Sequence, residues 1–215
     1  MTKLDIISDV ICPWCYIGKT KLDRALQAKP DHGLVIEWHP YMLNPDMPAE
    51  GMDRREYLEL KFGGKQGATD VYSSIAQAAE EAGLEVRFDL IQRTPSTLDA
   101  HRLIHWAGLE GVQVAVVSTL FHAYFRDGLD ISDHGVLTDI AASCGMGRAV
   151  ITKLLAQDAD IDDIRKRARN AAARGVRGVP CFIIDNHYVV QGAQPADLWE
   201  KVIDDIAAQA GAARS

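Results

Sequence analysis

The segments that predict β-strands lie only at the two ends of this 215-residue chain. Near the N-terminus, residues 4–8 and 34–38 form apolar runs rich in β-branched side chains. Near the C-terminus, residues 179–184 and 188–190 have the same character. From about residue 52 to residue 158 we find no convincing strand, only helical stretches separated by glycine-rich or capped breaks. A β-sheet of this chain must therefore combine strands from both ends.

Helical patterns complete the order of elements. One helix is predicted to begin close to Cys12-Pro13, and the last helix has the apolar stripe Trp199, Val202, Ile203 and Ile206. The order is strand–helix–strand, a helical segment, and then helix–strand–strand–helix. This order indicates an α/β class protein, with a thioredoxin fold interrupted by an all-α helical insertion. We predict that residues 1–48 and 161–215 form the two parts of that fold and that residues 49–160 form the insertion.

Two thiols separated by two residues, Cys12 and Cys15, lie where the first strand meets the first helix. Unpaired backbone N–H groups and the helix dipole favour a thiolate at such a position. We therefore expect Cys12 to be the nucleophile and Cys15, one turn inside the helix, to be the resolving thiol. Pro13 lacks an N–H that the helix would not use, and Trp14 offers an apolar face beside the sulfur.

Two other roles compete with redox chemistry for this C-P-W-C motif. Half of a structural zinc site is disfavoured, because Cys144 and Cys181 have no partner two to four residues away and no matching histidine pair accompanies them. An inert pair of core thiols is disfavoured, because paired thiols at a strand-to-helix junction are typical of redox motifs. We therefore predict redox chemistry and no metal site.

Three segments together resemble the DsbA-family oxidoreductases of the FrnE-like branch. They are the run from Ser8 to Gly18 that contains C-P-W-C, the tripeptide Gly178-Val179-Pro180, and Gly192-Ala193-Gln194-Pro195. The segments 40–45 and 99–106 agree with the same family. The resemblance implies a cis peptide bond at Val179-Pro180 that faces the thiol pair. It also implies that the Val179 backbone pairs with a bound thiol peptide, as a sheet edge does.

From these observations we assign the candidate site. The catalytic residues are Cys12, Cys15 and Pro180. The substrate-binding residues are Val179, Trp14, Pro13, His39, Asn44 and His101. No covalently bound cofactor is expected beyond the redox-active pair Cys12–Cys15, and glutathione is compatible as a thiol substrate. Protein or small-molecule disulfides and thiols are the expected partners.

Two rival functions stay open at this stage. The same superfamily contains 2-hydroxychromene-2-carboxylate isomerases and kappa-class glutathione transferases, which resemble this chain but typically carry Ser at the position of Cys12. The cysteine favours disulfide exchange over isomerisation. The second rival is a non-catalytic binding or chaperone protein that uses a cleft of the helical insertion.

Several further side chains have both a structural and a functional interpretation. Cys181 and Cys144 are more simply small buried hydrophobic residues than redox thiols. His101 and His105 share one helix face but have no third ligand, so a capping or cleft-lining role is favoured over metal binding. Asp9 could tune proton transfer near Cys12. The basic run 165–169 is most simply the solvated face of its helix.

Composition limits the possible partners. The chain has 23 Lys and Arg against 30 Asp and Glu, a net charge of −7, which disfavours nucleic acid as a partner. Its longest apolar stretch, 112–125, is shorter than the roughly 18 residues of a membrane span and contains polar residues. Residues 1–9 do not resemble a secretory signal, and four cysteines are too few for a disulfide-stapled scaffold. We expect a soluble cytoplasmic protein, with a dimer compatible and the oligomeric state open.

At neutral pH we expect iodoacetamide to alkylate Cys12 before Cys15, Cys144 and Cys181, because thiolate fraction and exposure set the alkylation rate. Mass mapping of the labelled peptides at short times measures the order. Labelling of Cys144 or Cys181 as fast as Cys12 in the folded protein would show that the nucleophile is wrongly assigned.

Overall fold

A four-stranded sheet joins the two ends of the chain, as expected. The computed structural model of the protein describes residues 1–173 and 175–212. The sheet has the order β2-β1-β5-β6. Its strands are β1 (Thr2–Ser8), β2 (Leu34–Pro40), β5 (Cys181–Ile184) and β6 (Tyr188–Gln191). Strand β1 pairs in parallel with β2 and antiparallel with β5, so the strands from the two chain ends meet at the centre of the sheet.

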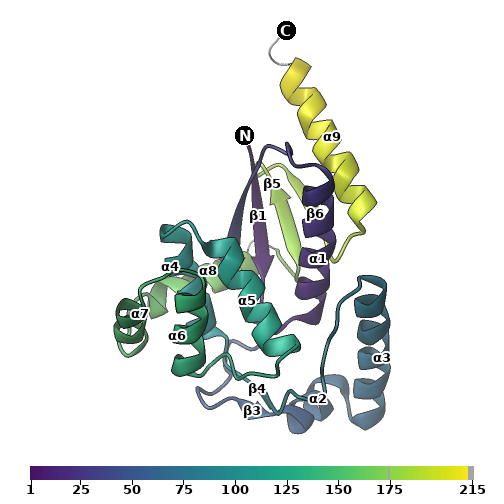
Figure 1. The fold of residues 1–215 in the computed structure, drawn as a ribbon. Coiled ribbons are helices and arrows are strands. Elements are labelled where there is room, and N and C mark those ends of the chain that lie inside the picture. The colour runs from purple at the N-terminus through teal and green to yellow at the C-terminus, as the bar shows by residue number, and fades with distance from the viewer. Residues whose placement is uncertain (174, 213–215) are drawn as a thin grey trace.

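Helices cover the sheet and fill the middle of the sequence (Figure 1). Those that belong to the sheet region are α1 (Pro13–Ala28), α8 (Ile161–Ala173) and α9 (Ala196–Ala212). Those of the middle region are α2 (Arg54–Phe62), α3 (Lys65–Glu81), α4 (Leu98–Leu109), α5 (Gln113–Phe125), α6 (His134–Ser143) and α7 (Arg148–Leu155). The fold is therefore a thioredoxin fold interrupted by a largely helical segment. The domain boundaries after residues 48 and 160 stay a prediction.

One detail of the middle region differs from expectation. Strands β3 (Met52–Asp53) and β4 (Arg93–Thr94) pair antiparallel there, so the prediction of no strand between residues 52 and 158 was wrong. Two residues are too few to show a period of two in the sequence. The pairing depends instead on close tertiary contact at Gly51, the residue before β3. Gly51 has a φ of +68°, and a Cβ there would lie 2.6 Å from the Thr94 carbonyl oxygen, so a larger residue would hold the two strands apart.

The two faces of the sheet have different coverings. Leu4 and Ile6 of β1 belong to the main core, which includes residues of α1 and α9. On this face the Phe182 ring packs edge-on against Trp199 of α9 at 4.7 Å. On the opposite face, Ile7 and Cys181 pack with Val176, just beyond α8. Helix α1, which begins within the C-P-W-C motif, is therefore held against one face only.

Aromatic stacking fixes the helical segment against the start of α1. The Tyr16 ring, next to Cys15 in sequence, stacks on Phe121 at 5.2 Å and on Phe125 at 5.6 Å, both from α5. Parallel aromatic packing of this kind adds to the hydrophobic burial of the rings. The first turn of α1 is thus held between the sheet and α5.

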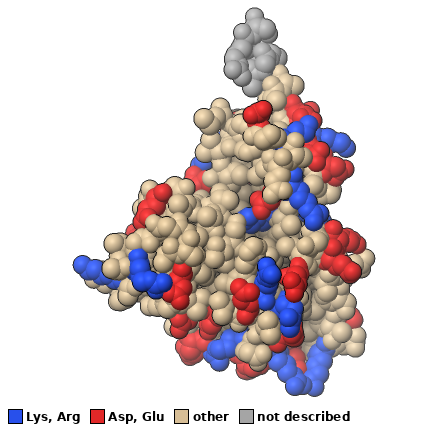
Figure 2. Space-filling view, in the orientation of Figure 1, with Lys and Arg blue, Asp and Glu red and all other residues tan. Residues whose placement is uncertain are grey.

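Charged side chains are mixed on the visible face of the molecule (Figure 2). Lysines and arginines alternate there with aspartates and glutamates, and no broad area of one sign covers this face. Among the described residues, no helix is both long enough and apolar enough to cross a membrane.

A buried arginine ties α4 to the segment that leads back to the sheet. The Arg102 side chain is 1% exposed and lies 5.0 Å from the Trp106 ring centre. Its guanidinium donates hydrogen bonds to the Asp99 carboxylate and to the carbonyl oxygens of Leu154, Gln157 and Ala159. Since each of these acceptors loses a hydrogen bond if the guanidinium is removed, the connection between α7 and α8 depends on this side chain.

We expect Arg102→Met to lower the free energy of unfolding by about 3–5 kcal/mol, because it removes the hydrogen bonds that a buried guanidinium donates to three carbonyl groups and to the partly exposed Asp99 carboxylate. Chemical denaturation measures the loss. Arg148→Met is the matched control, since Arg148 pairs with Asp139 at the surface and both side chains are more than half exposed. Equal effects of the two substitutions would contradict the structural role of Arg102.

Candidate active site

Cys12 lies at the junction between β1 and α1. Its backbone is extended, with φ −85° and ψ 113°, and it is the N-cap residue of α1, with Pro13 at the first helical position. The Cys12 N–H donates to the Asp9 carbonyl at 3.0 Å, which closes the turn that follows β1. The proline sets φ for the first helical residue and removes an N–H that has no partner there. The sequence thus fixes the helix start directly after the first thiol.

The sulfur of Cys12 is placed differently from the simplest expectation. It accepts no capping hydrogen bond within α1. Pro13 has no N–H, and the Cys15 N–H donates to the Cys12 carbonyl at 3.0 Å, so neither residue offers a backbone donor to the sulfur. The Cys12 thiol instead lies 3.6 Å from the carbonyl oxygen of Val179 and donates to it.

Val179 and Pro180 bring the C-terminal part of the chain to the thiol. The peptide bond between them is cis, and the Pro180 carbonyl accepts a hydrogen bond from the Gly192 N–H at 2.8 Å. Pro180 is buried, while Val179 is half-buried. The structure therefore brings the predicted residues Cys12, Val179 and Pro180 together, although 167 positions separate Cys12 from Val179.

A glycine in α1 permits this approach. A Cβ atom at Gly18 would lie 2.9 Å from Cγ of Pro180 and 3.4 Å from Cα of Ala193. The proline ring cannot swing away as a flexible side chain would, so only glycine fits the observed spacing. Gly18 therefore sets how closely the Pro180 loop lies against the helix that carries both thiols.

The second thiol is more deeply placed than the first. Cys12 is 4% exposed and Cys15 is 1% exposed, and both are free thiols. Burial, together with the neighbouring Cys12 sulfur, raises the pKa of the Cys15 thiol well above its usual range. The Ser8 side chain and a backbone hydrogen bond from Asp9 act in the opposite direction on this pKa. In the reduced protein Cys15 is therefore a neutral thiol that must lose a proton before it can attack.

Asp9 is a structural anchor beside the thiols. Its carboxylate is fully buried and accepts a hydrogen bond from the Leu43 N–H at 2.7 Å. The imidazole of His101 lies 3.6 Å from the same carboxylate and bonds to the Tyr41 carbonyl at 2.9 Å. His101 is only 3% exposed, so its position supports a role in holding the loop after β2, and not direct contact with substrate.

Asn44 lies in the same loop but faces α2. Its Oδ1 atom accepts hydrogen bonds from the Tyr57 hydroxyl and the Lys61 ammonium, each at 3.1 Å. Its Nδ2 atom is buried and has no hydrogen-bond partner among residues 1–173 and 175–212. Asn44, Tyr57 and Lys61 all line a cavity of about 340 Å³ together with Met47. Substrate binding by Asn44 stays a prediction.

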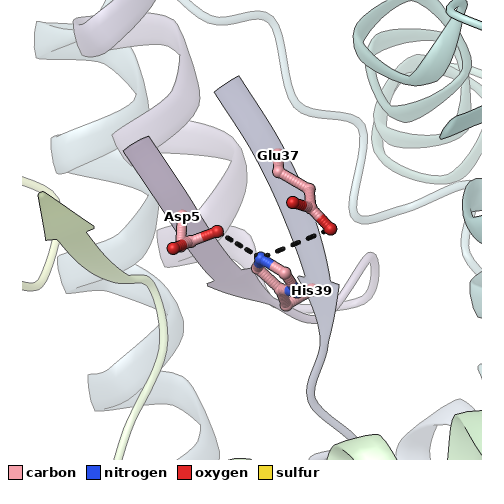
Figure 3. A group of neighbouring side chains, drawn as sticks. All are labelled: Asp5, Glu37 and His39. Carbon is pink, nitrogen blue, oxygen red and sulfur yellow. Dashed lines mark hydrogen bonds and ion pairs between the residues drawn. The ribbon is translucent and has the colours of Figure 1, made fainter. Parts of the chain in front are cut away.

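His39 lies on the sheet face opposite α1. Figure 3 shows its imidazole between the carboxylates of Asp5 and Glu37, and the nearer oxygen, from Asp5, is 2.6 Å from Nε2. Three such side chains could ligate a cation, but the Lys3 ammonium already lies 2.9 Å from Asp5 and 2.8 Å from Glu37. Burial disfavours ionisation of Asp5, but hydrogen bonds from Lys3 and His39 outweigh it and lower the pKa of this carboxyl group.

Arg167 completes this polar group from α8. Its guanidinium bonds to Nδ1 of His39 at 3.3 Å and to Nδ1 of His105 at 3.1 Å. Because arginine can only donate, both ring nitrogens are acceptors here, and the His39 proton lies on Nε2, facing Asp5. The interpretation of residues 165–169 as a purely solvated face was therefore wrong for Arg167. Its side chain is 28% exposed and connects α8 to β2 and α4.

The remaining cysteines and Trp14 have separate environments. Cys181 is fully buried, and this burial raises the pKa of its thiol, which supports a packing role. Cys181 and His39 both line a cavity of about 470 Å³ on the sheet face opposite α1. Cys144 is half-buried and contacts the Thr119 hydroxyl at 3.5 Å. Cys144 is therefore more accessible to iodoacetamide than the buried Cys12. Faster alkylation of Cys12 would then result from a larger thiolate fraction and not from greater exposure. The Trp14 side chain is 38% exposed beside the thiols.

Comparison with known families assigns the chain. The DsbA-like thioredoxin domain family matches residues 3–204. This chain belongs to that family. The match includes both thiols, the Val179-Pro180 segment and the whole helical region between them, so the family assignment covers the site as well as the sheet.

Solved structures of DsbA-like proteins and their relatives have the same fold. A probable DsbA oxidoreductase from Streptomyces coelicolor is 29% identical, with a TM-score of 0.84 over 95% of this chain and 89% of that chain. A cytosolic disulfide reductase, DsbM from Pseudomonas aeruginosa, is 19% identical, with a TM-score of 0.71 over 96% and 99% of the two chains. A 2-hydroxychromene-2-carboxylate isomerase is 16% identical, with a TM-score of 0.73 over 99% and 100%.

Three residues of this DsbA-like protein received no functional role from the sequence. Gly18 and Ser8 lie within the motif segment, and Arg167 lies in the basic run. The alternation of β1 side chains could have indicated Ser8, since it shares a face with Leu4 and Ile6. No local pattern indicates that Gly18 meets Pro180 or that Arg167 meets two histidines, because these contacts join distant segments.

We expect Gly18→Ala to destabilise this DsbA-like protein by about 1–3 kcal/mol and to slow disulfide exchange, because the added methyl group must displace the Pro180 ring. Thermal unfolding and an exchange assay measure the two effects. Gly178→Ala is the control, since a Cβ at that position meets no atom of the described residues within 4 Å. Wild-type exchange by Gly18→Ala would contradict the importance of this close approach.

Proposed function

We propose that this DsbA-like protein is a thiol–disulfide oxidoreductase that exchanges disulfides through Cys12 and Cys15. The observation that carries the proposal is the position of the Cys12 thiol, at the start of α1 and 3.6 Å from the Val179 carbonyl oxygen. A thiol at a helix start beside a free peptide edge suits attack on a disulfide in an extended peptide.

The proposed reaction has two steps. The Cys12 thiolate attacks one sulfur of a substrate disulfide, forms a mixed disulfide and releases the other substrate sulfur as a thiolate. Cys15 then loses its proton and attacks the Cys12 sulfur, which releases the second substrate thiolate and leaves a Cys12–Cys15 disulfide. Two electrons pass from the protein to the substrate. In the reverse direction the same steps oxidise a dithiol.

Substrate positioning is proposed for the groups around the thiols. The Val179 backbone would pair with the bound peptide and Pro180 would shape that edge, while Pro13 and Trp14 would contact the substrate beside the sulfur. Protein or small-molecule disulfides are the proposed partners. The half-exposed indole of Trp14 offers an apolar surface for such contacts.

Glutathione is a proposed thiol substrate or reductant of this protein. DsbM has also been solved with GSH, and it is described as a cytosolic disulfide reductase. By analogy we propose that this protein works in the cytoplasm. The direction of exchange then follows from the potential of the thiol pool, because a dithiol reduces substrates when its own potential is lower than theirs.

A glutathione-dependent isomerase or transferase is the rival enzyme class, since an isomerase of this type has the same fold. Such an activity would require bound glutathione and would survive loss of Cys15. A cysteine at position 12 favours exchange, because a thiolate is the nucleophile that disulfide exchange requires. A non-catalytic binding protein would keep its partner after loss of both thiols.

We expect Cys12→Ser to reduce insulin reduction and the refolding of scrambled ribonuclease to the uncatalysed rate, because the attacking thiolate is lost. Cys15→Ser should instead accumulate mixed disulfides, which non-reducing gels and mass spectrometry detect. Cys144→Ser is the control and should retain wild-type exchange.

Two other outcomes would contradict the proposed function. Isomerase or transferase activity with glutathione that persists in Cys15→Ser would establish the rival enzyme class. Full exchange activity in Cys12→Ser would show that the proposed nucleophile is wrong.

A further inference from the structure

The Ser8 hydroxyl is a buried polar group without a partner. Ser8 is 4% exposed, and its Oγ atom makes no hydrogen bond in the described part of the chain. Burial of a hydroxyl without a partner costs stability, and an alanine at this position would avoid that cost. Because buried hydroxyl groups in native proteins are normally hydrogen-bonded, the unpartnered Ser8 hydroxyl points to another state of the protein in which it gains a partner.

The backbone holds Ser8 in place on both sides. It is the last residue of β1, where it lies opposite Pro40 of β2, and its carbonyl accepts the Tyr41 N–H at 3.0 Å. Directly after it, the Asp9 carboxylate is fixed by the Leu43 N–H. Only rotation about the Ser8 side-chain bonds is therefore free to change the direction of the hydroxyl.

The position of Ser8 in β1 directs its side chain toward α1. Side chains alternate along a strand, so Ser8 shares a face with Leu4 and Ile6. Both belong to the core that includes Cys15. Ile7 packs with Cys181 on the opposite face. Ser8 thus ends β1 on the face against which the first turn of α1 is buried.

We propose that Ser8 is a positioning residue for the resolving step, in which its hydroxyl donates a hydrogen bond to the Cys15 sulfur once that sulfur has lost its proton. This inference rests on the disulfide exchange proposed above. Cys15 is 1% exposed, so water can stabilise its anion only poorly, and the hydroxyl replaces part of that solvation.

The groups that shift the pKa of Cys15 agree with a position of Ser8 close to this thiol. Burial raises the pKa of Cys15, and the Ser8 side chain is one of the two groups that lower it. A hydrogen bond to the charged form favours ionisation. Since the thiolate fraction below the pKa rises about tenfold per pH unit, a lower pKa for Cys15 means faster attack at a given pH.

The step conserves atoms and charge. The Cys15 proton passes to the buffer, and the Cys15 sulfur attacks the Cys12 sulfur of the mixed disulfide. The bond between Cys12 and the substrate sulfur breaks, and the substrate leaves as a thiolate. The hydroxyl keeps its own proton throughout, because it only donates a hydrogen bond.

The test separates the two steps with dithio-bis-nitrobenzoate, an aromatic disulfide whose thiolate product absorbs visible light. Reduced protein is mixed with the reagent in a stopped-flow instrument over a range of pH. Attack by Cys12 releases the first thiolate, and resolution by Cys15 releases the second. Cys15→Ser identifies the second phase by its loss, and the double variant Cys12→Ser/Cys15→Ser measures the contribution of Cys144 and Cys181.

We expect Ser8→Ala to leave the first phase within about twofold of wild type and to slow the second phase about tenfold or more, since a hydrogen bond to a charged group is lost. The pH profile of the second phase should shift to higher pH. Ser8→Thr keeps a hydroxyl and should restore both the rate and the profile. Should Ser8→Ala not fold, Ser8→Thr against the isosteric Ser8→Val makes the same comparison.

The outcomes distinguish this inference from the function on which it rests. A wild-type protein that shows no second phase would overturn both. A wild-type second phase that Ser8→Ala leaves unchanged in rate and pH profile would overturn only the role of Ser8. Equal slowing of both phases with unshifted profiles would also overturn it, because a general packing defect would then explain the loss.

Discussion

The close approach of α1 to the Val179-Pro180 segment is the contact on which the site depends. Gly18 lets the helix meet the Pro180 ring, and the Cys12 thiol meets the Val179 carbonyl about 1.7 helical turns earlier in the sequence. Neither segment can hold this position alone. Antiparallel pairing of β1 with β5 brings the two chain ends together, and α5 fixes the other side of the helix by stacking on Tyr16.

Buried polar groups keep the surroundings of the thiols rigid. Asp9 joins the turn before Cys12 to the loop after β2, and His101 fixes that loop from α4. On the other face, Arg167 joins α8 to His39 and His105. In low dielectric surroundings such hydrogen bonds are costly to break, so they hold the helical segment and the sheet in one geometry. A fixed geometry suits a reaction between sulfur atoms that must be aligned.

Much of the fold could be predicted from local pattern. The four strands of the main sheet and the start of α1 at Pro13 follow from β-branched runs and from proline at the first helical position. The short pair β3 and β4 could not be predicted, because strands of two residues are too short to show an alternation of apolar and polar side chains. The sequence predicts His39 as a substrate-binding residue, yet strand register places it beside Asp5 on the face of the sheet opposite α1.

The sequence by itself determined the chemistry that is available. It has two thiols separated by two residues, a proline directly after the first thiol that starts the helix, and a second proline after Val179. These features are positions in the sequence, so they are the same whatever structure the chain adopts. Only the tertiary structure decided that Val179 faces Cys12, that Gly18 meets Pro180 and that the Ser8 hydroxyl is buried with no hydrogen-bond partner among the described residues. These relations join residues from separate elements, and they depend on strand register and helix packing, which no local periodicity specifies.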